Sequence, residues 1–403
     1  MEKVFIVAAK RTAIGAFTGS LKDVPAGQLA AAAIKGALEA GNVAPETVNE
    51  VILGNVVSAG QGMGIGRQAA IFAGLPESVP AYAINMVCGS GMKAVMDAVS
   101  HIRCGDANVV VAAGVENMSQ IPFAASGSLR GGQKMGDIGL KDLLINDGLT
   151  DVYNQYHMGV TAENVAKQVG LSREQQDAYA QQSQQKAVAA VEAGRFKDEI
   201  VPVEVKQRRQ TVVFDTDEYP KADCTQEGLA KLRPAFDREG TVTAGNASGL
   251  NDGASAVVVA SEAAVQRLGL KPLAEITSYA QVGLDPKIMG LGPVGAVTQA
   301  LKKAEISISD VDLFELNEAF AAQALGVVHQ LADTHHVSAD SILQKANVNG
   351  GAIALGHPLG ASGNRILVSL IHELKKREGT VGVASLCIGG GMGTAVVVKR
   401  VDS

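Results

Sequence analysis

The chain has 403 residues, of which 47% are hydrophobic, 19% charged and only 4% aromatic, with 46 glycines and no Trp. This composition is typical of a globular protein large enough for two or three cores. The formal net charge of −6 argues against a duplex-binding surface, and no apolar run reaches the length of a membrane span, so the sequence predicts no nucleic-acid or membrane partner.

Strands and helices alternate along the first part of the chain, as in a mostly parallel α/β sheet. Strands are predicted at residues 4–8 and 51–57, and a helix over 26–40 that ends at Gly41. A second helix is predicted over 92–103, and the continuous apolar run at 108–113 predicts a strand buried on both faces.

The four cysteines carry information about compartment and chemistry. Cys88, Cys104, Cys224 and Cys387 form no CxxC pair and no zinc-like spacing with histidines. The apolar run at the start is too short for a secretory signal. We therefore expect reduced thiols, no bound metal and a cytoplasmic location.

Residues 120–249 have a different character, because polar residues and glutamines increase and the strand–helix alternation stops. An exposed amphipathic helix is predicted over 172–193. The pattern indicates an inserted, peripheral region. It contains a basic cluster, for which a solvated surface and a phosphate-facing patch both stay open: Lys206, Arg208, Arg209, Lys221, Lys231 and Arg233.

The α/β alternation returns at 254–260, and this second half resembles the first. NMVCGSG at 85–91 leads into a helix and a buried strand, while GHPLGASG at 356–363 leads into a predicted helix over 364–376 and a strand at 380–384. The repeat predicts two similar α/β halves. It places Cys88 and His357 at related strand-to-helix junctions, where α/β proteins bind ligands.

Cys88 is the candidate nucleophile. A thiol at a helix N-terminus meets unpaired N–H groups and a partial positive charge, which favour the thiolate. A buried core cysteine is the alternative, but Gly89, Ser90 and Gly91 indicate a turn, which is a poor place for a core residue.

Three further residues complement this thiol. His357, in a glycine-rich loop, is the natural base for a cysteine nucleophile. Cys387 precedes three glycines that could form a nest of N–H donors for an oxyanion, and a second thiol suits acyl transfer followed by proton transfer at carbon. Asn317 in FELNEAF could orient water, although this segment alone favours a helix N-cap.

Taken together and in this order, these segments resemble the thiolase family over essentially the whole chain, from KRTAIGAF at 10–17 to CIGGGMG at 387–393. NMVCGSG resembles the nucleophile motif, NEAF the asparagine motif, GGAIALGHPLGASG the histidine motif and CIGGG the second-cysteine motif. YHMG at 156–159 is similar to the biosynthetic-type acetoacetyl-CoA thiolases.

The resemblance implies a fold and an assembly. The thiolase fold is a five-layer α-β-α-β-α arrangement of two similar mixed-sheet halves with an inserted loop domain. The expected bounds are 1–119 plus 250–270 for the first half, 120–249 for the loop domain and 271–403 for the second half. The loop domain would bind CoA and carry tetramer contacts, and the assembly would be a homotetramer built as a dimer of dimers.

The resemblance also implies a reaction, the condensation of two acetyl-CoA to acetoacetyl-CoA and CoA through acetyl-Cys88. His357 would deprotonate Cys88, and Cys387 would deprotonate the second acetyl-CoA. His357 with a water on Asn317 would form one oxyanion hole, and the N–H groups of Cys88 and Gly389 the other. No cofactor is implied. The residues expected around CoA and the acyl group are Leu149, His157, Met158, Lys221, Ser248, Met289, Ala319 and Phe320.

Three alternatives stay open at this point. A degradative 3-ketoacyl-CoA thiolase of broader chain length would share the catalytic residues, although residues 156–159 argue against it. A 3-ketoacyl carrier-protein synthase would share the fold but not the second cysteine, and a binding protein without turnover would not need all four motifs. Residues 328–346 are longer than the family pattern leads us to expect, and we predict a surface extension there.

Overall fold

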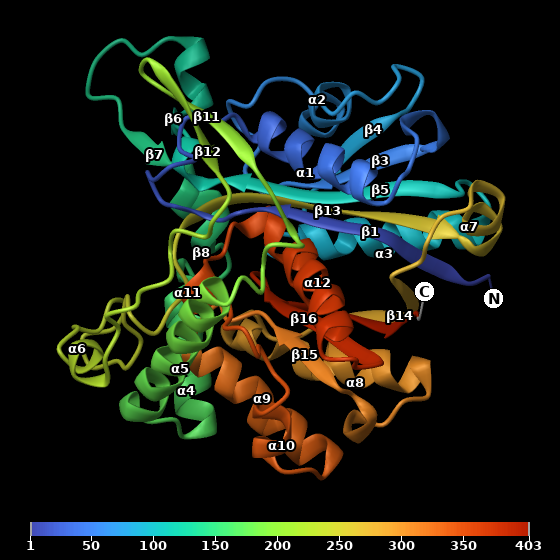
Figure 1. Ribbon diagram of the computed structural model, residues 1–403. Coiled ribbons are helices and arrows are strands. Elements are labelled where there is room, and N and C mark those ends of the chain that lie inside the picture. The colour runs from blue at the N-terminus through green and yellow to red at the C-terminus, as the bar shows by residue number, and fades with distance from the viewer. Residues whose placement is uncertain (1, 402–403) are drawn as a thin grey trace.

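Two sets of strands with the same order and directions form the core in the computed structural model, which describes residues 2–401 (Figure 1). The first set runs β1 (Val4–Thr12), β13 (Asn251–Ser261), β5 (Val109–Asn117), β3 (Glu50–Gly54) and β4 (Ala81–Ile84). The second runs β14 (Ala274–Gly283), β17 (Met392–Arg400), β16 (Val381–Ile388) and β15 (Leu313–Leu316). In both sets two antiparallel pairings are followed by a parallel one, which confirms the predicted repeat.

The two sets meet at their first strands, because β1 pairs antiparallel with β14 at Ile6 and Ala274. A register shift follows Ile6 in β1, and an equivalent shift follows Ile276 in β14. The two halves are therefore similar even in the position of a register shift in their first strands.

Helices cover both faces of each set and complete the five layers (Figure 1). Helices α1 (Ala26–Ala40) and α2 (Ile65–Phe72) cover the outer face of the first set, and α8 (Gly292–Ala304) and α9 (Ala321–His335) that of the second. Helices α3 (Ser90–Cys104) and α12 (Leu359–Lys376) lie between the sets.

The strand sequences explain this layering, since successive side chains of a strand point to opposite faces. Val258 packs toward α1, whereas its neighbour Val257 packs into the central layer. In the second set Val396 points into the same central layer and Val397 toward α8. Strands that are apolar at every position are thus buried on both faces, as the run at 108–113 predicted.

Helices α3 and α12 approach each other at glycines near their N-termini. A Cβ placed on Gly91 of α3 would lie 2.7 Å from the carbonyl oxygen of Gly360. A Cβ on Gly363 of α12 would in turn lie 2.7 Å from the backbone nitrogen of Met92. The two helix N-termini are therefore in reciprocal backbone contact, which side chains would prevent.

Helix α12 begins earlier than predicted, at Leu359 instead of residue 364. Glycine is a poor helix former, so Gly360 and Gly363 favoured a loop in the sequence. In the structure Pro358 occupies the N-cap, and the close approach to α3 makes these glycines favourable in the helix. The prediction for residues 26–40 was accurate, because α1 has those bounds.

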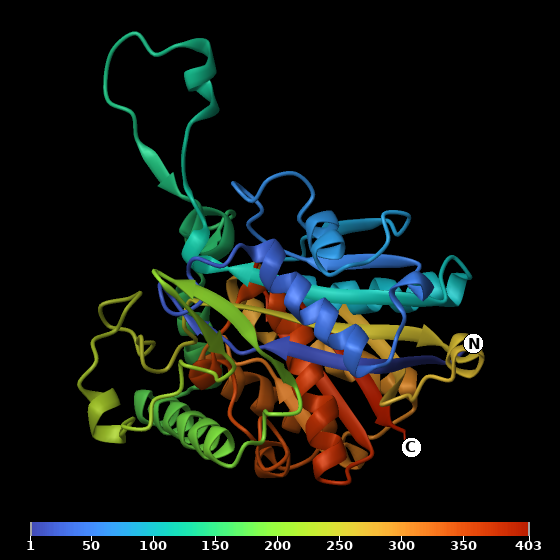
Figure 2. The same cartoon turned by 45° about the horizontal axis from the view of Figure 1, so that its top comes forward.

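The segment between β5 and β13 carries α4 (Met158–Val169), α5 (Arg173–Glu192) and three strand pairs. Ser172 caps α5 in a capping box with Gln175, close to the predicted start. The β6 (Phe123–Ala125) and β7 (Leu140–Asp142) pair forms the base of an arm that projects from the molecule (Figure 2). The other pairs are β8 (Thr150–Asp151) with β9 (Tyr156–His157), and β11 (Val203–Gln207) with β12 (Gln210–Phe214).

The remaining β-strands and α-helices are short. They are β2 (Gly15–Ala16), β10 (Ile200–Val201), α6 (Gln226–Ala230), α7 (Glu262–Leu268), α10 (Ala339–Leu343) and α11 (Ala352–Leu355).

Residues 328–346 form more than a surface extension, which corrects that expectation. They complete α9 and form α10, and Leu331, Ile342 and Ala346 are buried in the outer core of the second strand set. The polar residues of DTHHVSAD suggested exposure, but they cover only one face of a segment whose other face is apolar.

Candidate active site

Cys88 lies in a tight turn between β4 and α3. Val87 before it has a φ of +46°, a left-handed conformation that is rare for a β-branched residue. The Ser90 hydroxyl accepts the N–H of Met86 at 2.8 Å and donates to the carbonyl oxygen of Val87 at 2.6 Å. These bonds close the turn and fix the position of the thiol.

Burial raises the pKa of Cys88 to about 11, and the charge of Glu116 adds to the increase. The N–H groups of Gly389 and of Cys88 itself act in the opposite direction. The sequence favoured a thiolate at the helix N-terminus, but the raised pKa makes Cys88 a neutral thiol at rest. Cys88 therefore requires a base. The two N–H groups beside its sulfur are the pair expected to bind an oxyanion.

His357 is held by hydrogen bonds on its backbone and on one ring nitrogen. Its N–H donates to Oδ1 of Asn251 at 3.0 Å, and its Nδ1 lies 2.6 Å from Oγ of Ser362. The hydroxyl of Ser362 donates to the carbonyl oxygen of Pro358 at 3.0 Å, so Oγ accepts a proton from Nδ1. Nε2 is then the unprotonated nitrogen, and within the described chain it has no hydrogen-bond partner.

The pKa of His357 is lowered to about 3, mainly by burial and further by the charge of Arg365. The imidazole is consequently neutral near pH 7, which is the form that can accept a proton. The loop after His357 contacts the Cys88 region, since Leu359 packs in the same apolar cluster as Cys88.

Cys387 lies near the end of β16 and is only 1% exposed. Burial raises its pKa, and the charge of a Cys88 thiolate raises it further. The turns that follow the two thiols touch, because a Cβ on Gly89 would lie 2.4 Å from Cδ1 of Ile388. The structure thus brings the two cysteines into one site, at the boundary of the two halves.

Asn317 follows β15, and its N–H donates to the carbonyl oxygen of Ser385 in β16 at 3.0 Å. Its side chain is 1% exposed, and neither amide atom has a partner among residues 2–401. The alternative role as a helix cap does not apply, because Phe320 occupies the N-cap of α9. An unpaired buried amide is unfavourable unless water or a ligand completes its hydrogen bonds.

Four predicted acyl-pocket residues surround Cys387. An apolar cluster around this thiol contains Met158, Met289, Ala319 and Phe320. Leu149 packs instead beside Cys88, in the neighbouring cluster. The two clusters thus cover the surroundings of both thiols with apolar side chains, as an acyl group requires.

His157 and Ser248 lie at the border of this cluster. The His157 ring stacks on Phe236 at a centroid distance of 4.5 Å, and Phe236 meets the Phe320 ring edge-on. Burial lowers the pKa of His157, whose Nδ1 accepts the N–H of Gly159. Ser248 donates its N–H to the carbonyl oxygen of Ala319 at 3.0 Å. His157 therefore lies at the border of the cluster as a ring stacked on Phe236.

Lys221 lies in a separate cavity of about 240 Å³, which Tyr219 and Leu229 also line. Its ammonium lies 5.3 Å from the centre of the Tyr219 ring. A cavity with one cation and an aromatic ring can accommodate a phosphorylated nucleotide.

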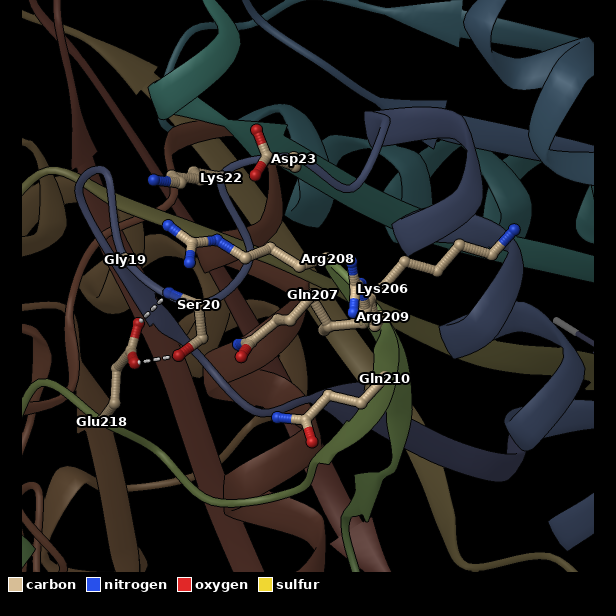
Figure 3. Close-up of a pocket in the computed structure, with 11 residues that line it drawn as sticks. Gly19, Ser20, Lys22, Asp23, Lys206, Gln207, Arg208, Arg209, Gln210 and Glu218 are labelled. Carbon is tan, nitrogen blue, oxygen red and sulfur yellow. Dashed lines mark hydrogen bonds between the residues drawn. The ribbon is translucent and has the colours of Figure 1, made fainter.

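The basic cluster of the sequence is divided in space. Figure 3 shows Lys206, Arg208 and Arg209 on the β11–β12 hairpin, along a groove of about 1090 Å³ that the loop with Ser20 and Lys22 closes on the other side. Neither thiol lines this groove. The structure therefore separates Lys221 from the hairpin cations, which the sequence could not do.

Sequence reasoning missed the residues that support the site: Glu116, Asn251, Ser362 and Phe236. Glu116 carried a usable signal, because a carboxylate directly after a continuous apolar strand is unusual and calls for partners. Asn251 offered no such signal, since its partner His357 is distant in the sequence. Ser362 offered none either, since its contact with His357 depends on the first turn of α12. Among residues 2–401 no group of three or more His, Cys, Asp or Glu side chains could hold a metal ion, and no helix there is long and apolar enough to cross a membrane.

Two repeated α/β halves with two thiols, a neutral imidazole and paired N–H groups at their boundary define a thiol-dependent acyltransferase. Residues 4–263 match the family description "Thiolase, N-terminal domain", and residues 270–400 match "Thiolase, C-terminal domain". The chain belongs to the thiolase family.

Individual relatives are similar over nearly their full lengths. The chain is 58% identical to an acetyl-CoA acetyltransferase of Cupriavidus necator over 402 residues, which cover 99% of this chain and 100% of that protein. The crystal structure of the Bacillus anthracis acetyl-CoA acetyltransferase is 46% identical, with a TM-score of 0.95, and the match covers 100% of this chain and 99% of the other. Human mitochondrial 3-ketoacyl-CoA thiolase in complex with CoA is 47% identical, with a TM-score of 0.93 and coverage of 100% and 98%.

Proposed function

We propose that the protein is an acetyl-CoA C-acetyltransferase that condenses two acetyl-CoA reversibly to acetoacetyl-CoA and CoA. One observation carries the proposal: the imidazole of His357, whose Nε2 has no hydrogen-bond partner among residues 2–401, lies in the same site as two thiols, Cys88 and Cys387, whose pKa values are both raised. A hydrolase needs one nucleophile, whereas carbon–carbon bond formation needs a nucleophile and a strong base. The names of the close relatives agree with this reaction.

In the first half-reaction, His357 takes the proton of Cys88, and the thiolate attacks the thioester carbonyl of acetyl-CoA. The CoA thiolate leaves, takes the proton of Cys387 and departs as CoA. The acetyl group stays on Cys88, the Cys387 thiolate is formed and the imidazolium holds the first proton. The N–H groups of Cys88 and Gly389 stabilise the oxyanion, each contributing on the order of 3 kcal/mol.

In the second half-reaction, the Cys387 thiolate removes a proton from the methyl group of a second acetyl-CoA. The carbanion attacks acetyl-Cys88, acetoacetyl-CoA forms, and the Cys88 thiolate regains its proton from His357. Both thiols and the imidazole return to their starting states. The high pKa of Cys387 suits this step, because a weakly basic thiolate would not deprotonate carbon. A water bound by Asn317 and the imidazolium of His357 would stabilise the enolate oxygen.

The proposal also specifies the length of the acyl group. Met158, His157 and Phe236 form a rigid wall that favours acetyl over long chains. A degradative 3-ketoacyl-CoA thiolase remains the second candidate, since a protein of that name has nearly the same fold. Thiolysis rates of four-carbon and longer 3-ketoacyl-CoAs distinguish the two.

We propose that the Lys221 cavity receives the nucleotide end of CoA and that the protein is a homotetramer in the cytoplasm. The β6–β7 arm supports self-association, because it exposes Phe123, Met135 and Leu140. Such apolar side chains on a projecting arm are typical of an interface. Light scattering should give a tetramer for the full chain and a smaller species when these three residues are replaced by serine.

The central test is to incubate the protein with labelled acetyl-CoA and map the acetyl thioester by mass spectrometry. The label is expected on Cys88 alone. Cys387→Ala should still accept the label but lose condensation, by a factor of about 10² to 10⁴. Cys104→Ala, at the exposed end of α3, is the matched control and should retain both steps. Acetyl on another residue, or equal loss of both steps in Cys387→Ala, would refute the mechanism.

A further inference from the structure

Glu116, the penultimate residue of β5, is fully buried and surrounded by donors. Its carboxylate accepts the N–H groups of Val56 and Val57 at 3.0 and 3.2 Å, and that of Gly360 at 2.9 Å. Nδ2 of Asn55 donates to it at 3.2 Å. All four neighbours are donors, so this arrangement complements an ionised carboxylate.

These donors come from two parts of the fold. Asn55, Val56 and Val57 follow β3 in the first half, whereas Gly360 lies in the first turn of α12 in the second half. Glu116 therefore connects the two halves with one side chain. Its charge also faces the positive end of the α12 dipole, which is a favourable position for an anion.

The space at this junction is filled. A Cβ on Gly360 would lie 2.4 Å from the carbonyl oxygen of Val115 and 2.8 Å from Oε2 of Glu116. The first turn of α12 thus has little freedom to move relative to β5. Because His357 is three residues before Gly360, a shift of this turn would move the imidazole away from Cys88.

Glu116 has no role in the proposed reaction steps, yet its charge acts on the nucleophile. It raises the pKa of Cys88. Burial, with a further contribution from the charge of Asp252, raises the pKa of Glu116 itself to about 7 despite the donors, so the group is mostly ionised at pH 8.

We propose that Glu116 is a positioning residue of the active site, which fixes the first turn of α12 and with it His357 relative to Cys88. The inference rests on the proposed function for the roles of these two residues. Glu116 itself carries no reacting atom. It holds the base His357, from the second half, in position beside the nucleophile Cys88, from the first half.

Two variants distinguish the effect of the length of the Glu116 side chain from the effect of its charge. Glu116→Asp keeps the charge but shortens the side chain by one methylene, so it cannot contact both Val56 and Gly360. Glu116→Gln keeps the length but removes the charge. Asp252→Asn is the matched control, because Asp252 is another buried carboxylate nearby and its oxygens accept the N–H and hydroxyl of Ser119.

The readout is the rate at which iodoacetamide alkylates Cys88 in the full chain as a function of pH, followed together with kcat and thermal unfolding. At pH 7 this rate depends on His357 as base, so His357→Gln defines the rate without it. Glu116→Asp should fall toward that rate and lose about a hundredfold in kcat, as expected for a misplaced catalytic group. Its alkylation midpoint at high pH should stay at the wild-type value.

Glu116→Gln should shift the alkylation midpoint to lower pH, because the negative charge near Cys88 is gone. Asp252→Asn should keep wild-type kcat and pH-7 rate. A folded Glu116→Asp protein with the wild-type pH-7 alkylation rate would overturn the proposal. The proposal would also be overturned if the unfolded fraction of Glu116→Asp accounted for its whole loss of kcat. Alkylation needs no acetyl-CoA, so failure of the wild type to condense acetyl-CoA would refute the proposed function and leave this test intact.

Discussion

Oγ of Ser362 lies 2.6 Å from Nδ1 of His357, and its own proton points to the carbonyl oxygen of Pro358. One hydroxyl in the first turn of α12 therefore sets the tautomer of the His357 imidazole. It leaves the lone pair of the buried Nε2 without a partner in the part of the chain that the structure describes. A carboxylate in this place would make the imidazole more basic, whereas a hydroxyl orients it without adding charge.

Replacing Ser362 with Ala should lower kcat about fivefold, which corresponds to the loss of one hydrogen bond worth ~1 kcal/mol. The imidazole could then adopt either tautomer, and only one has a free Nε2. Steady-state kinetics of acetoacetyl-CoA thiolysis provide the measurement. Ser369→Ala, a buried serine of the same helix whose hydroxyl bonds Glu199, should keep wild-type kcat. Equal rates for Ser362→Ala and wild type would show that the hydroxyl does not orient the ring.

Asn317→Ala should separate activity from stability. Its amide has no protein partner within the described residues, so its removal should lower kcat about a hundredfold without lowering the free energy of unfolding. Asn347→Ala is the contrasting variant, because the Asn347 amide bonds both backbone groups of Leu316. That change should destabilise the fold by about 1–3 kcal/mol. Urea unfolding and kcat measured on the same samples decide, and a marked loss of stability in Asn317→Ala would contradict the assignment.

Met158 should limit the length of the acyl group. Its Sδ lies 3.3 Å from where a Cβ on Gly389 would stand, so its side chain fills the space beside the proposed oxyanion hole. Met158→Ala should raise the rate of six-carbon relative to four-carbon 3-ketoacyl-CoA thiolysis about tenfold. Met96→Ala removes another buried methionine, from the central helix layer, and should leave the ratio unchanged. An unchanged ratio in Met158→Ala would place the chain-length limit elsewhere.

Glu315 should make the stability of the protein depend on pH. Burial raises its pKa from 4.5 to about 8, and Arg365, whose Nη1 is 3.7 Å away, offsets this only in part. The folded state thus binds the proton more tightly than the unfolded state. The stability linked to that proton is present below pH 4.5 and is lost as the pH rises toward 8.

Glu315→Gln cannot titrate, so the unfolding free energy of the wild type minus that of the variant should decrease between about pH 4.5 and 8 and then level off. Urea unfolding at several pH values measures this difference. Glu204→Gln, at an exposed position of β11, should give a curve parallel to the wild type. A parallel curve for Glu315→Gln would mean that its carboxyl has an ordinary pKa in the fold.

The sequence was sufficient for the features that depend on local pattern. The helix at 26–40, the doubly buried strand at 108–113 and the repeat of two halves all follow from hydrophobic periodicity and turn residues. The turn at Cys88 was also recognisable, because glycines after a thiol are rare in a core. The roles of the individual site residues stay predictions until the variants are measured.

Features that depend on distant partners could not be predicted. The early start of α12 requires the contact with α3, and the high pKa of Cys88 requires the burial that the whole fold provides. The carboxylate of Glu116 after an apolar strand signalled a need for partners, but the sequence could not identify them, since its donors come from residues about 60 and 244 positions away. The burial of Ile342 was hidden by the polar residues that precede it.

The reciprocal backbone contact at Gly91 and Gly363 has a consequence for how such chains can be recombined. Each half contributes one of the two glycines, and the reactive side chains are divided as well, with Cys88 in the first half and His357 and Cys387 in the second, so neither half holds the complete site. A hybrid that joins the first half of this chain to the second half of a relative should be active only if both glycines are retained. The contact between the two halves thus limits which halves of related proteins can replace one another.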